Sequence, residues 1–171
     1  MPNITQYKGL EKYYFYKIIN SIIEIAKLRD TTKIILDYGC GQKILSKILN
    51  NDNVKNYDIN PEYSDFKSIN NIKFDIVVMN HVLMYMSLSQ IINLFNKIKL
   101  LNSDCLFVLG IGKQNFISKI AKNLSMNFDA HRDTKISYND QINLINETMH
   151  IIDYKKNIFF MTDIYFTKFK S

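Results

Sequence analysis

Short apolar segments alternate with amphipathic helical segments along most of this chain of 171 residues. The apolar segments are rich in β-branched residues and too short for helices, so they are predicted to be buried strands. They lie at 33–38, 54–59, 74–80 and 105–111. Because helical segments separate them, we expect a doubly wound α/β sheet, mostly parallel, with helices on both faces.

The helical segments follow from apolar residues that recur at helical spacing. They are predicted near 10–28, 44–49, 88–101, 114–124 and 138–148. Ser87 and Gln90 have the spacing of a capping box at the start of the third.

Residues 149–169 differ from the rest, because two extended segments, 151–160 and 164–169, leave no space for a helix between them. This pattern predicts a terminal hairpin that adds one antiparallel strand to the sheet. No repeat or linker divides the chain. We therefore expect a single domain over 1–171, with a helical cap at 1–30 and an α/β core at 33–169.

Ligands of open α/β sheets bind beyond the carboxyl ends of the strands. The residues expected there are Asp37, Gly39, Cys40, Gly41, Asp58, Asn60, Asn80, His81 and Gly110. Gly39 and Gly41 allow a tight turn and close approach of a ligand to the backbone. Asp58 follows Gly39 by nineteen positions and ends the second strand, where a carboxylate can accept hydrogen bonds from ribose hydroxyls.

Each of these two signals also has a purely structural interpretation. The glycines fit an ordinary strand-to-helix turn, and Asp58 fits a turn before Asn60 and Pro61. Their joint position favours a ligand that contains a nucleoside. A dinucleotide is disfavoured, because Ile44 stands where the dinucleotide motif requires a third small residue.

Composition narrows the setting. The net charge of +6 comes from scattered lysines. This scatter does not favour a nucleic-acid partner, although it does not exclude one. Cys40 and Cys105 have neither metal-site nor disulfide spacing and are expected to be reduced. No apolar run is long enough to span a membrane, and the first residues lack a signal-peptide core, so we expect a cytoplasmic protein without membrane contact.

Three segments resemble the class I S-adenosylmethionine (SAM)-dependent methyltransferases. Residues 35–41 (Ile-Leu-Asp-Tyr-Gly-Cys-Gly) are similar to motif I, and 57–61 to the second motif. Residues 74–83 are similar to the fourth-strand motif of the small-molecule branch. The resemblance extends over 33–169 and implies a single-domain, Rossmann-like methyltransferase fold whose terminal hairpin supplies the family's reversed strand.

By position, the resemblance implies SAM as cofactor and assigns a set of cofactor-binding residues. They are Asp37, Gly39, Cys40, Gly41, Asp58, Ile59 and Asn80. The two glycines are expected beside the methionine part of SAM, and Asp37 is expected to orient its amino group. Asp58 is expected to hold the ribose hydroxyls, Ile59 to pack on the adenine, and Asn80 with His81 to line the pocket near the sulfonium.

The sequence departs from the family pattern in three places. Lys43 replaces the frequent third glycine, and Tyr85 replaces a histidine that is common after the fourth strand. Only seventeen positions separate Asp58 from Asp75, which leaves little room for the usual helix and third strand. We expect this shortened middle to retain residues 68–69 as a remnant of that strand and to leave the adenine pocket open.

On the acceptor side, the candidate catalytic residues are His131, His81 and Tyr85, with Asp133 and Tyr138 as further polar candidates. His131 lies between Arg132 and Asp133, which suits a general base or an anion contact, although a surface loop explains the same residues. His81 is expected to orient or cover the cofactor rather than to act as the base.

Three functions remain open at this level. The first is SAM-dependent methyl transfer to an oxygen or nitrogen atom of a small molecule. The second is methylation of RNA or protein, disfavoured for DNA bases because the amino-methylating motif is absent after the fourth strand. The third is a non-catalytic SAM-binding or partner-binding module. The sequence defines neither the acceptor nor the oligomeric state.

Overall fold

The computed structural model describes residues 10–113 and 134–170. Its first half contains α1 (Leu10–Ile25), β1 (Ile35–Tyr38), α2 (Ile44–Leu49), β2 (Val54–Tyr57), the 3-10 turn η2 (Ile69–Asn71) and β3 (Ile76–Asn80). Its second half contains the 3-10 turn η3 (Leu83–Tyr85), α3 (Leu88–Leu101), β4 (Leu106–Gly112), α5 (Tyr138–Thr148), β5 (Met149–Ile158) and β6 (Thr162–Phe169). The predicted helix near 114–124 falls outside the described residues.

The strands form one six-stranded sheet in the order β2-β1-β3-β4-β6-β5. The strands β1 to β4 pair in parallel, whereas β6 pairs antiparallel with both β4 and β5. This arrangement confirms the predicted doubly wound sheet with one reversed strand near its end. The hairpin turn comes earlier than expected, at Phe159 and Phe160, so Thr162 and Asp163 belong to β6.

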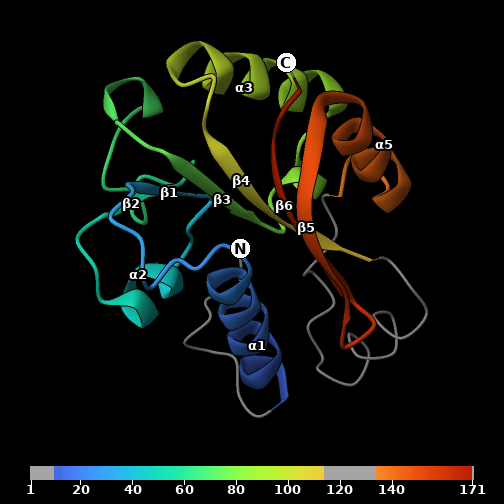
Figure 1. Cartoon of the computed structure of the whole chain (residues 1–171), viewed down its shortest axis with the longest axis horizontal. Coiled ribbons are helices and arrows are strands. Elements are labelled where there is room, and N and C mark those ends of the chain that lie inside the picture. Colours follow the sequence, from blue (N-terminus) through green and yellow to red (C-terminus); the bar gives the residue numbers. More distant parts are fainter. Residues whose placement is uncertain (1–9, 114–133, 171) are drawn as a thin grey trace.

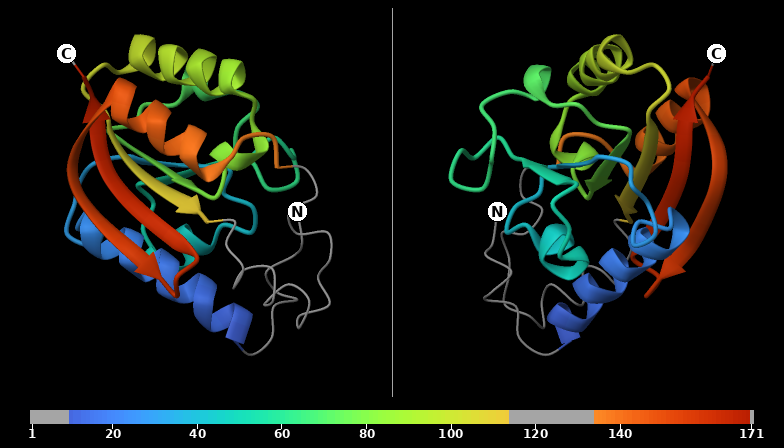
Figure 2. Two further views of the ribbon diagram at one scale, coloured as in Figure 1. Left: turned by 90° about the vertical axis from the view of Figure 1, so that its right-hand side faces the viewer. Right: turned by 60° about the vertical axis from the view of Figure 1, so that its left-hand side comes forward.

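Helices cover both faces of the sheet (Figures 1 and 2). The helices α1 and α2 cover one face, where Ile18, Ile22 and Leu45 pack on the sheet. The helices α3 and α5 cover the other face. Alternate residues of β3 and β4 enter the two cores, because successive side chains of a strand point to opposite faces.

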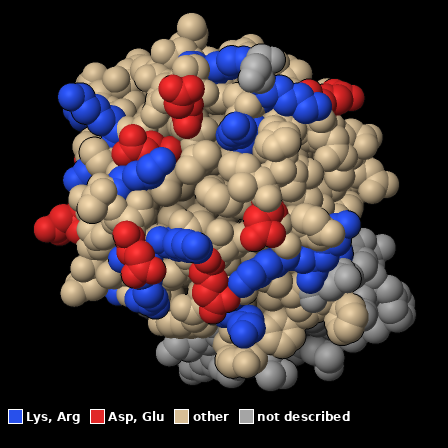
Figure 3. Space-filling view, in the orientation of Figure 1, with Lys and Arg blue, Asp and Glu red and all other residues tan. Residues whose placement is uncertain are grey.

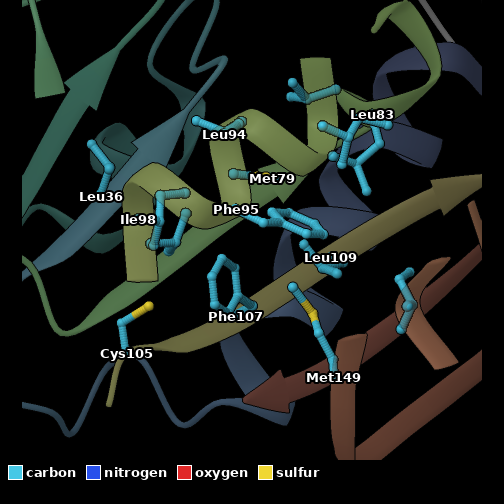
Figure 4. Packing of buried hydrophobic residues seen from close by; sticks show 14 of the residues in the cluster. Leu36, Met79, Leu83, Leu94, Phe95, Ile98, Cys105, Phe107, Leu109 and Met149 are labelled. Atoms are coloured by element: carbon cyan, nitrogen blue, oxygen red, sulfur yellow. The ribbon is translucent and has the colours of Figure 1, made fainter. Parts of the chain in front are cut away.

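The core under α3 is the larger of the two and contains its aromatic centre. Phe95 of α3 packs on Phe107 of β4 with ring centroids 5.8 Å apart (Figure 4). Phe169 of β6 contacts Phe107 with ring centroids 4.9 Å apart and completes the group. The helix α3 begins with the predicted capping box, in which Ser87 and Gln90 each bond the other's backbone N–H. This packing fixes α3 across β3 and β4.

The predicted remnant of a third strand at residues 68–69 is wrong. Ser68 instead accepts a hydrogen bond from Asn70 N at 3.2 Å and begins the 3-10 turn η2. Ile69 is buried in the core from this turn, so its apolar character reflects an anchor rather than a strand. As a result β2 is the edge strand of the sheet. Within the described ranges, no helix has both the length and the apolar character of a membrane span.

Candidate functional site

The carboxyl ends of β1, β2 and β3 meet at one edge of the sheet, because the three strands are parallel neighbours. This edge brings together the glycine turn after β1, Asp58 after β2, and Asn80 with His81 at the end of β3. The residues that the sequence placed at the strand ends therefore lie at one edge of the sheet. What each residue binds stays a prediction from the sequence.

The glycine turn is shaped by two glycines with positive φ, 76° at Gly39 and 47° at Gly41. A Cβ atom on Gly39 would lie 2.5 Å from Val82 Cγ2, so no larger residue fits there. A Cβ atom on Gly41 would have no neighbour within 4 Å, so that side of the turn faces open space. Gly39 is thus required by packing, whereas Gly41 leaves room for a ligand to approach the backbone.

Asp58 is buried and holds the glycine turn. Its Oδ2 accepts a hydrogen bond from Gly41 N at 2.9 Å, and its Oδ1 accepts one from Asn60 N at 2.9 Å. A carboxylate offers about four acceptor positions, so two remain for further donors. The neighbouring Ile59 is 91% exposed, which leaves the expected adenine position open to solvent on this side.

Asp37 lies beside Asp58 at the end of β1 and is almost completely buried. Burial, followed by the nearby charge of Asp58, raises the pKa of Asp37 to about 7. A carboxyl with this pKa is partly protonated near neutral pH, and a cationic ligand group would favour its charged form. Two buried acids at one sheet edge therefore form a site suited to a positively charged ligand.

Cys40 has a structural role in the turn. Its thiol donates a hydrogen bond to the Tyr63 carbonyl oxygen at 3.3 Å. Burial and the charges of Asp37 and Asp58 raise the pKa of Cys40 to about 12, so the sulfur is a neutral thiol. Cys40 thereby ties the glycine turn to the segment after β2.

The side-chain oxygen Oδ1 of Asn80 is buried and has no hydrogen-bond partner. In the described part of the chain, no other buried side-chain nitrogen or oxygen lacks one. Gly110 of β4 faces this atom so closely that a Cβ at position 110 would overlap it. An unpartnered buried carbonyl oxygen lowers stability by about 1–3 kcal/mol, so such an atom in a native protein commonly has a functional role. The sequence pointed to Asn80 and Gly110 as strand-end residues but gave no sign of this contact.

His81 has a strained backbone and a fixed ring. Its φ of 58° is rare for a residue with a side chain, and its N–H donates to the Gly110 carbonyl oxygen at 2.8 Å. The ring nitrogen Nε2 lies 2.9 Å from Thr162 Oγ1, which in turn lies 2.5 Å from the hydroxyl of Tyr14. A hydrogen-bonded chain thus joins α1, β6 and the end of β3.

Sequence reasoning missed the hydrogen-bonded chain that runs from His81 through Thr162 to Tyr14. From the sequence, Tyr14 was expected to pack with the first helix or to belong to an aromatic cover over the site, and Thr162 was expected in the hairpin turn rather than in a strand. Burial raises the pKa of Tyr14 to about 12, so its hydroxyl stays protonated and can donate to Thr162. Side-chain pairs this far apart in sequence have no local signal that would reveal them.

The other acceptor-side candidates are placed as follows. Tyr85 is half-buried in η3, next to the buried Leu83 and Met84. Tyr138 begins α5 and donates a hydrogen bond to Asp163 Oδ2 at 2.5 Å. The prediction for His131, with Arg132 and Asp133, lies outside the described residues.

Tyr138 belongs to a buried polar cluster that the sequence did not reveal. Asp163 of β6 is 1% exposed and pairs with Lys113, whose Nζ lies 2.9 Å from Asp163 Oδ1. Burial and the hydrogen bond to Asp163 raise the pKa of Tyr138 far above its ordinary value. The cluster lies at the carboxyl end of β4, so polar groups extend along the same sheet edge from β1 to β6.

Solved structures with the same architecture identify the fold. Magnesium protoporphyrin IX methyltransferase from Synechocystis PCC 6803, with bound SAM, superposes with a TM-score of 0.66 at 13% identity over 98% of this chain and 88% of that chain. The chain has the fold of the class I SAM-dependent methyltransferases. No model of a known protein family matches the sequence, and no curated protein matches it.

Two further structures show how widely this methyltransferase fold is used. The 1,6-didemethyltoxoflavin-N1-methyltransferase of Burkholderia thailandensis matches with a TM-score of 0.62 at 13% identity, over 90% of this chain and 78% of that chain. The small RNA methyltransferase HEN1 matches with a TM-score of 0.59 at 14% identity, over 94% of this chain but 25% of that chain. Among the described residues, no strand lies between β2 and β3 in sequence, and β2 has no strand partner on its outer side.

Proposed function

We propose that this protein binds SAM at the carboxyl ends of β1, β2 and β3 and transfers its methyl group to a small-molecule oxygen or nitrogen acceptor. The observation that supports this most directly is the glycine turn, which is bonded to the buried carboxylate of Asp58 and has open space beside Gly41. The open space lets a ligand approach the backbone, and the two remaining acceptor positions of Asp58 suit the ribose hydroxyls of SAM. The fold and the two adjacent acids agree with this assignment.

The residues present fit the parts of SAM. Asp37 and Asn80 would receive the cationic amino group, and Asp58 would accept hydrogen bonds from the ribose hydroxyls with its remaining lone pairs. Gly39 and Gly41 would allow the methionine part to approach the turn, and Ile59 would lie against the adenine. Cys40 would hold the turn through its bond to the segment after β2.

When bound, SAM supplies an electrophilic methyl group on a sulfonium centre. The chain's contribution is to align this group with the acceptor and to exclude water, which can provide much of the rate. His81, held by Thr162 and Tyr14, would form the fixed wall on the acceptor side, with Tyr85 nearby in sequence. An acceptor that must lose a proton needs a base, and His131 is the residue we propose for that role.

Methylation of RNA is the second candidate, because an RNA methyltransferase shares the fold and the net charge is +6. A protein that binds RNA phosphates usually shows a clustered basic face. On the face shown in Figure 3, lysine and arginine side chains alternate with acidic ones. This mixed distribution favours the small-molecule acceptor.

Methyl transfer from SAM that carries an isotopic label in its methyl group tests the proposal. The protein is incubated separately with a small-molecule cell extract and with total RNA, and the labelled products are counted. We expect label in the small-molecule fraction and its loss in Asn80→Ala. Label found in RNA alone would replace the proposal with the second candidate, and SAM binding without transfer to any fraction would indicate a non-catalytic module.

A further inference from the structure

The open edge of the sheet at β2 is closed by one residue rather than by a strand. Asn56 lies in β2, the edge strand, and its backbone N–H and carbonyl group face the open edge. The carbonyl oxygen of Asn56 accepts a hydrogen bond from Asp65 N at 3.0 Å. The Asp65 carboxylate accepts from Asn56 N at 3.4 Å and from Asn56 Nδ2 at 2.8 Å. Asp65 thus bonds both backbone groups of Asn56, which a neighbouring strand would otherwise pair.

Asp65 also holds the glycine turn from the other side. Its Oδ1 forms an ion pair with Nζ of Lys43, the residue that replaces the family's third glycine. Lys43 has a φ of 58°, which is unfavourable for any residue except glycine. A side chain kept at such a position needs a compensating contact, and the ion pair with Asp65 is that contact.

Ser46 closes the same network from α2. Its hydroxyl lies 3.0 Å from the Lys43 carbonyl oxygen and 3.2 Å from Asn56 Oδ1. The residues Lys43, Ser46, Asn56 and Asp65 therefore form a ring of contacts, which we call the edge lock. The edge lock joins the turn after β1, the first turn of α2, and β2.

Two further contacts connect the glycine turn to the segment that follows β2. Gly41 N donates to Asp58 Oδ2, and the Cys40 thiol donates to the Tyr63 carbonyl oxygen. Three residues of the glycine turn, Cys40, Gly41 and Lys43, are thus each bonded to the segment that follows β2. The shape of the turn depends on that segment, which contains no strand.

We propose that Asp65 is a positioning residue for the SAM site, which through Lys43 and Asn56 holds the glycine turn in its binding shape in place of the missing third strand. This inference rests on the proposed function. The Lys43 and Asp65 side chains are 32% and 39% exposed, so dissolved salt screens their attraction. SAM affinity should therefore weaken with ionic strength through this pair.

SAM titration by calorimetry at low and high salt tests the role of the pair. Lys43→Met should weaken SAM binding about three-fold at low salt, as for an exposed ion pair, and should abolish most of the salt dependence. Asp65→Ala should weaken binding about ten-fold, because it also removes the hydrogen bonds to Asn56. Lys43→Arg keeps the charge and should bind SAM like the wild type.

Two controls separate positioning from general stability. Glu24→Gln breaks the exposed pair between Glu24 and Lys155, on α1 and β5, and should leave SAM binding unchanged. Lys43→Gly removes the ammonium but also relieves the backbone strain that the ion pair compensates, so it should bind SAM more tightly than Lys43→Met. In turnover assays the Asp65 and Lys43 variants should raise the KM for SAM and leave kcat at saturating SAM unchanged.

The outcomes are distinguishable. If the wild type binds SAM and Asp65→Ala binds it equally well, or if Lys43→Met keeps the full salt dependence, the positioning role is wrong and the proposed function stands. A fall in kcat with unchanged KM would also overturn it. If the wild type does not bind SAM, both proposals fail. Amide exchange of Cys40 and Gly41 should be faster in Asp65→Ala than in Glu24→Gln, and equal rates would contradict the edge lock itself.

Discussion

At the scale of single residues, several features of the site lower the stability of the folded protein when no ligand is bound. Asp37 is buried with a raised pKa, and Asn80 keeps an unpartnered oxygen. His81 holds a backbone conformation that disfavours side chains. Such features are commonly found where a protein sacrifices stability for binding, and variants of Asp37 and Asn80 test this.

Asp37→Asn tests this trade through pH. A carboxyl with a raised pKa in the folded protein takes up protons more readily there than in the unfolded chain. The free energy of unfolding therefore falls as pH rises from the ordinary value of 3.8 to about 7. Asparagine does not ionise, so the free energy of unfolding of the variant does not fall in this way. At pH 8 the variant should therefore be more stable than the wild type by up to about 4 kcal/mol.

Thermal or denaturant unfolding across this pH range provides the measurement. The stability difference between Asp37→Asn and the wild type should shrink toward zero at pH 3, where the wild-type carboxyl is protonated in both states. SAM binding should weaken in the variant, because the negative charge is lost. A variant less stable than the wild type at pH 8 would show that Asp37 is already compensated in the empty protein.

Asn80→Ala separates the two roles of a buried polar group. The variant removes an oxygen without a partner, so its free energy of unfolding should stay within about 1 kcal/mol of the wild type. The loss of a hydrogen bond to a charged amino group should weaken SAM binding about ten-fold or more. Calorimetry and denaturant unfolding on the same samples measure both. Unchanged SAM affinity would remove Asn80 from the cofactor site.

At the scale of elements, a polar contact near the site adds to the apolar packing of α1 on the sheet. The hydroxyl of Tyr14 reaches Thr162 of β6, and Thr162 reaches His81. Tyr14→Phe should lower the free energy of unfolding by about 1 kcal/mol, the usual contribution of such a hydrogen bond. It should also lower kcat, because His81 loses part of its support. Tyr13→Phe, on the exposed side of α1, is the control.

The elements themselves were largely predictable from the sequence. The strand at 74–80, the capping box at Ser87 and the helix over 138–148 follow from local pattern, which periodicity and capping chemistry determine. Residues 68–69 were misassigned, because an apolar residue that anchors a 3-10 turn looks like a fragment of a strand. The turn at Phe159 and Phe160 was also missed, since two phenylalanines at positive φ give no turn signal.

At the scale of the whole molecule, the chain keeps the methyltransferase sheet with one edge strand removed. From the short spacing between Asp58 and Asp75 the sequence predicted a shortened middle with a remnant of the third strand at 68–69, and it indicated neither the 3-10 turn found there nor the contacts at the open edge of β2. Asp65 closes that edge with contacts to Asn56 and Lys43 that are distant in sequence. Likewise the glycine turn and Asp58 were predictable from strand ends, whereas the Asn80–Gly110 contact and the partners of His81 required the fold.

Calorimetric titration of the wild type and Asp58→Ala with SAM tests the central claim most directly. We expect one site per chain in the wild type with a Kd of about 1–100 μM, competition by S-adenosylhomocysteine, and binding at least ten-fold weaker in Asp58→Ala. Asp153→Ala is the matched control, because Asp153 also accepts a local backbone hydrogen bond, at 2.8 Å from Tyr154 N, but lies on β5. The absence of SAM binding by the folded wild type, or equal affinity in Asp58→Ala, would contradict a SAM site at the ends of β1, β2 and β3.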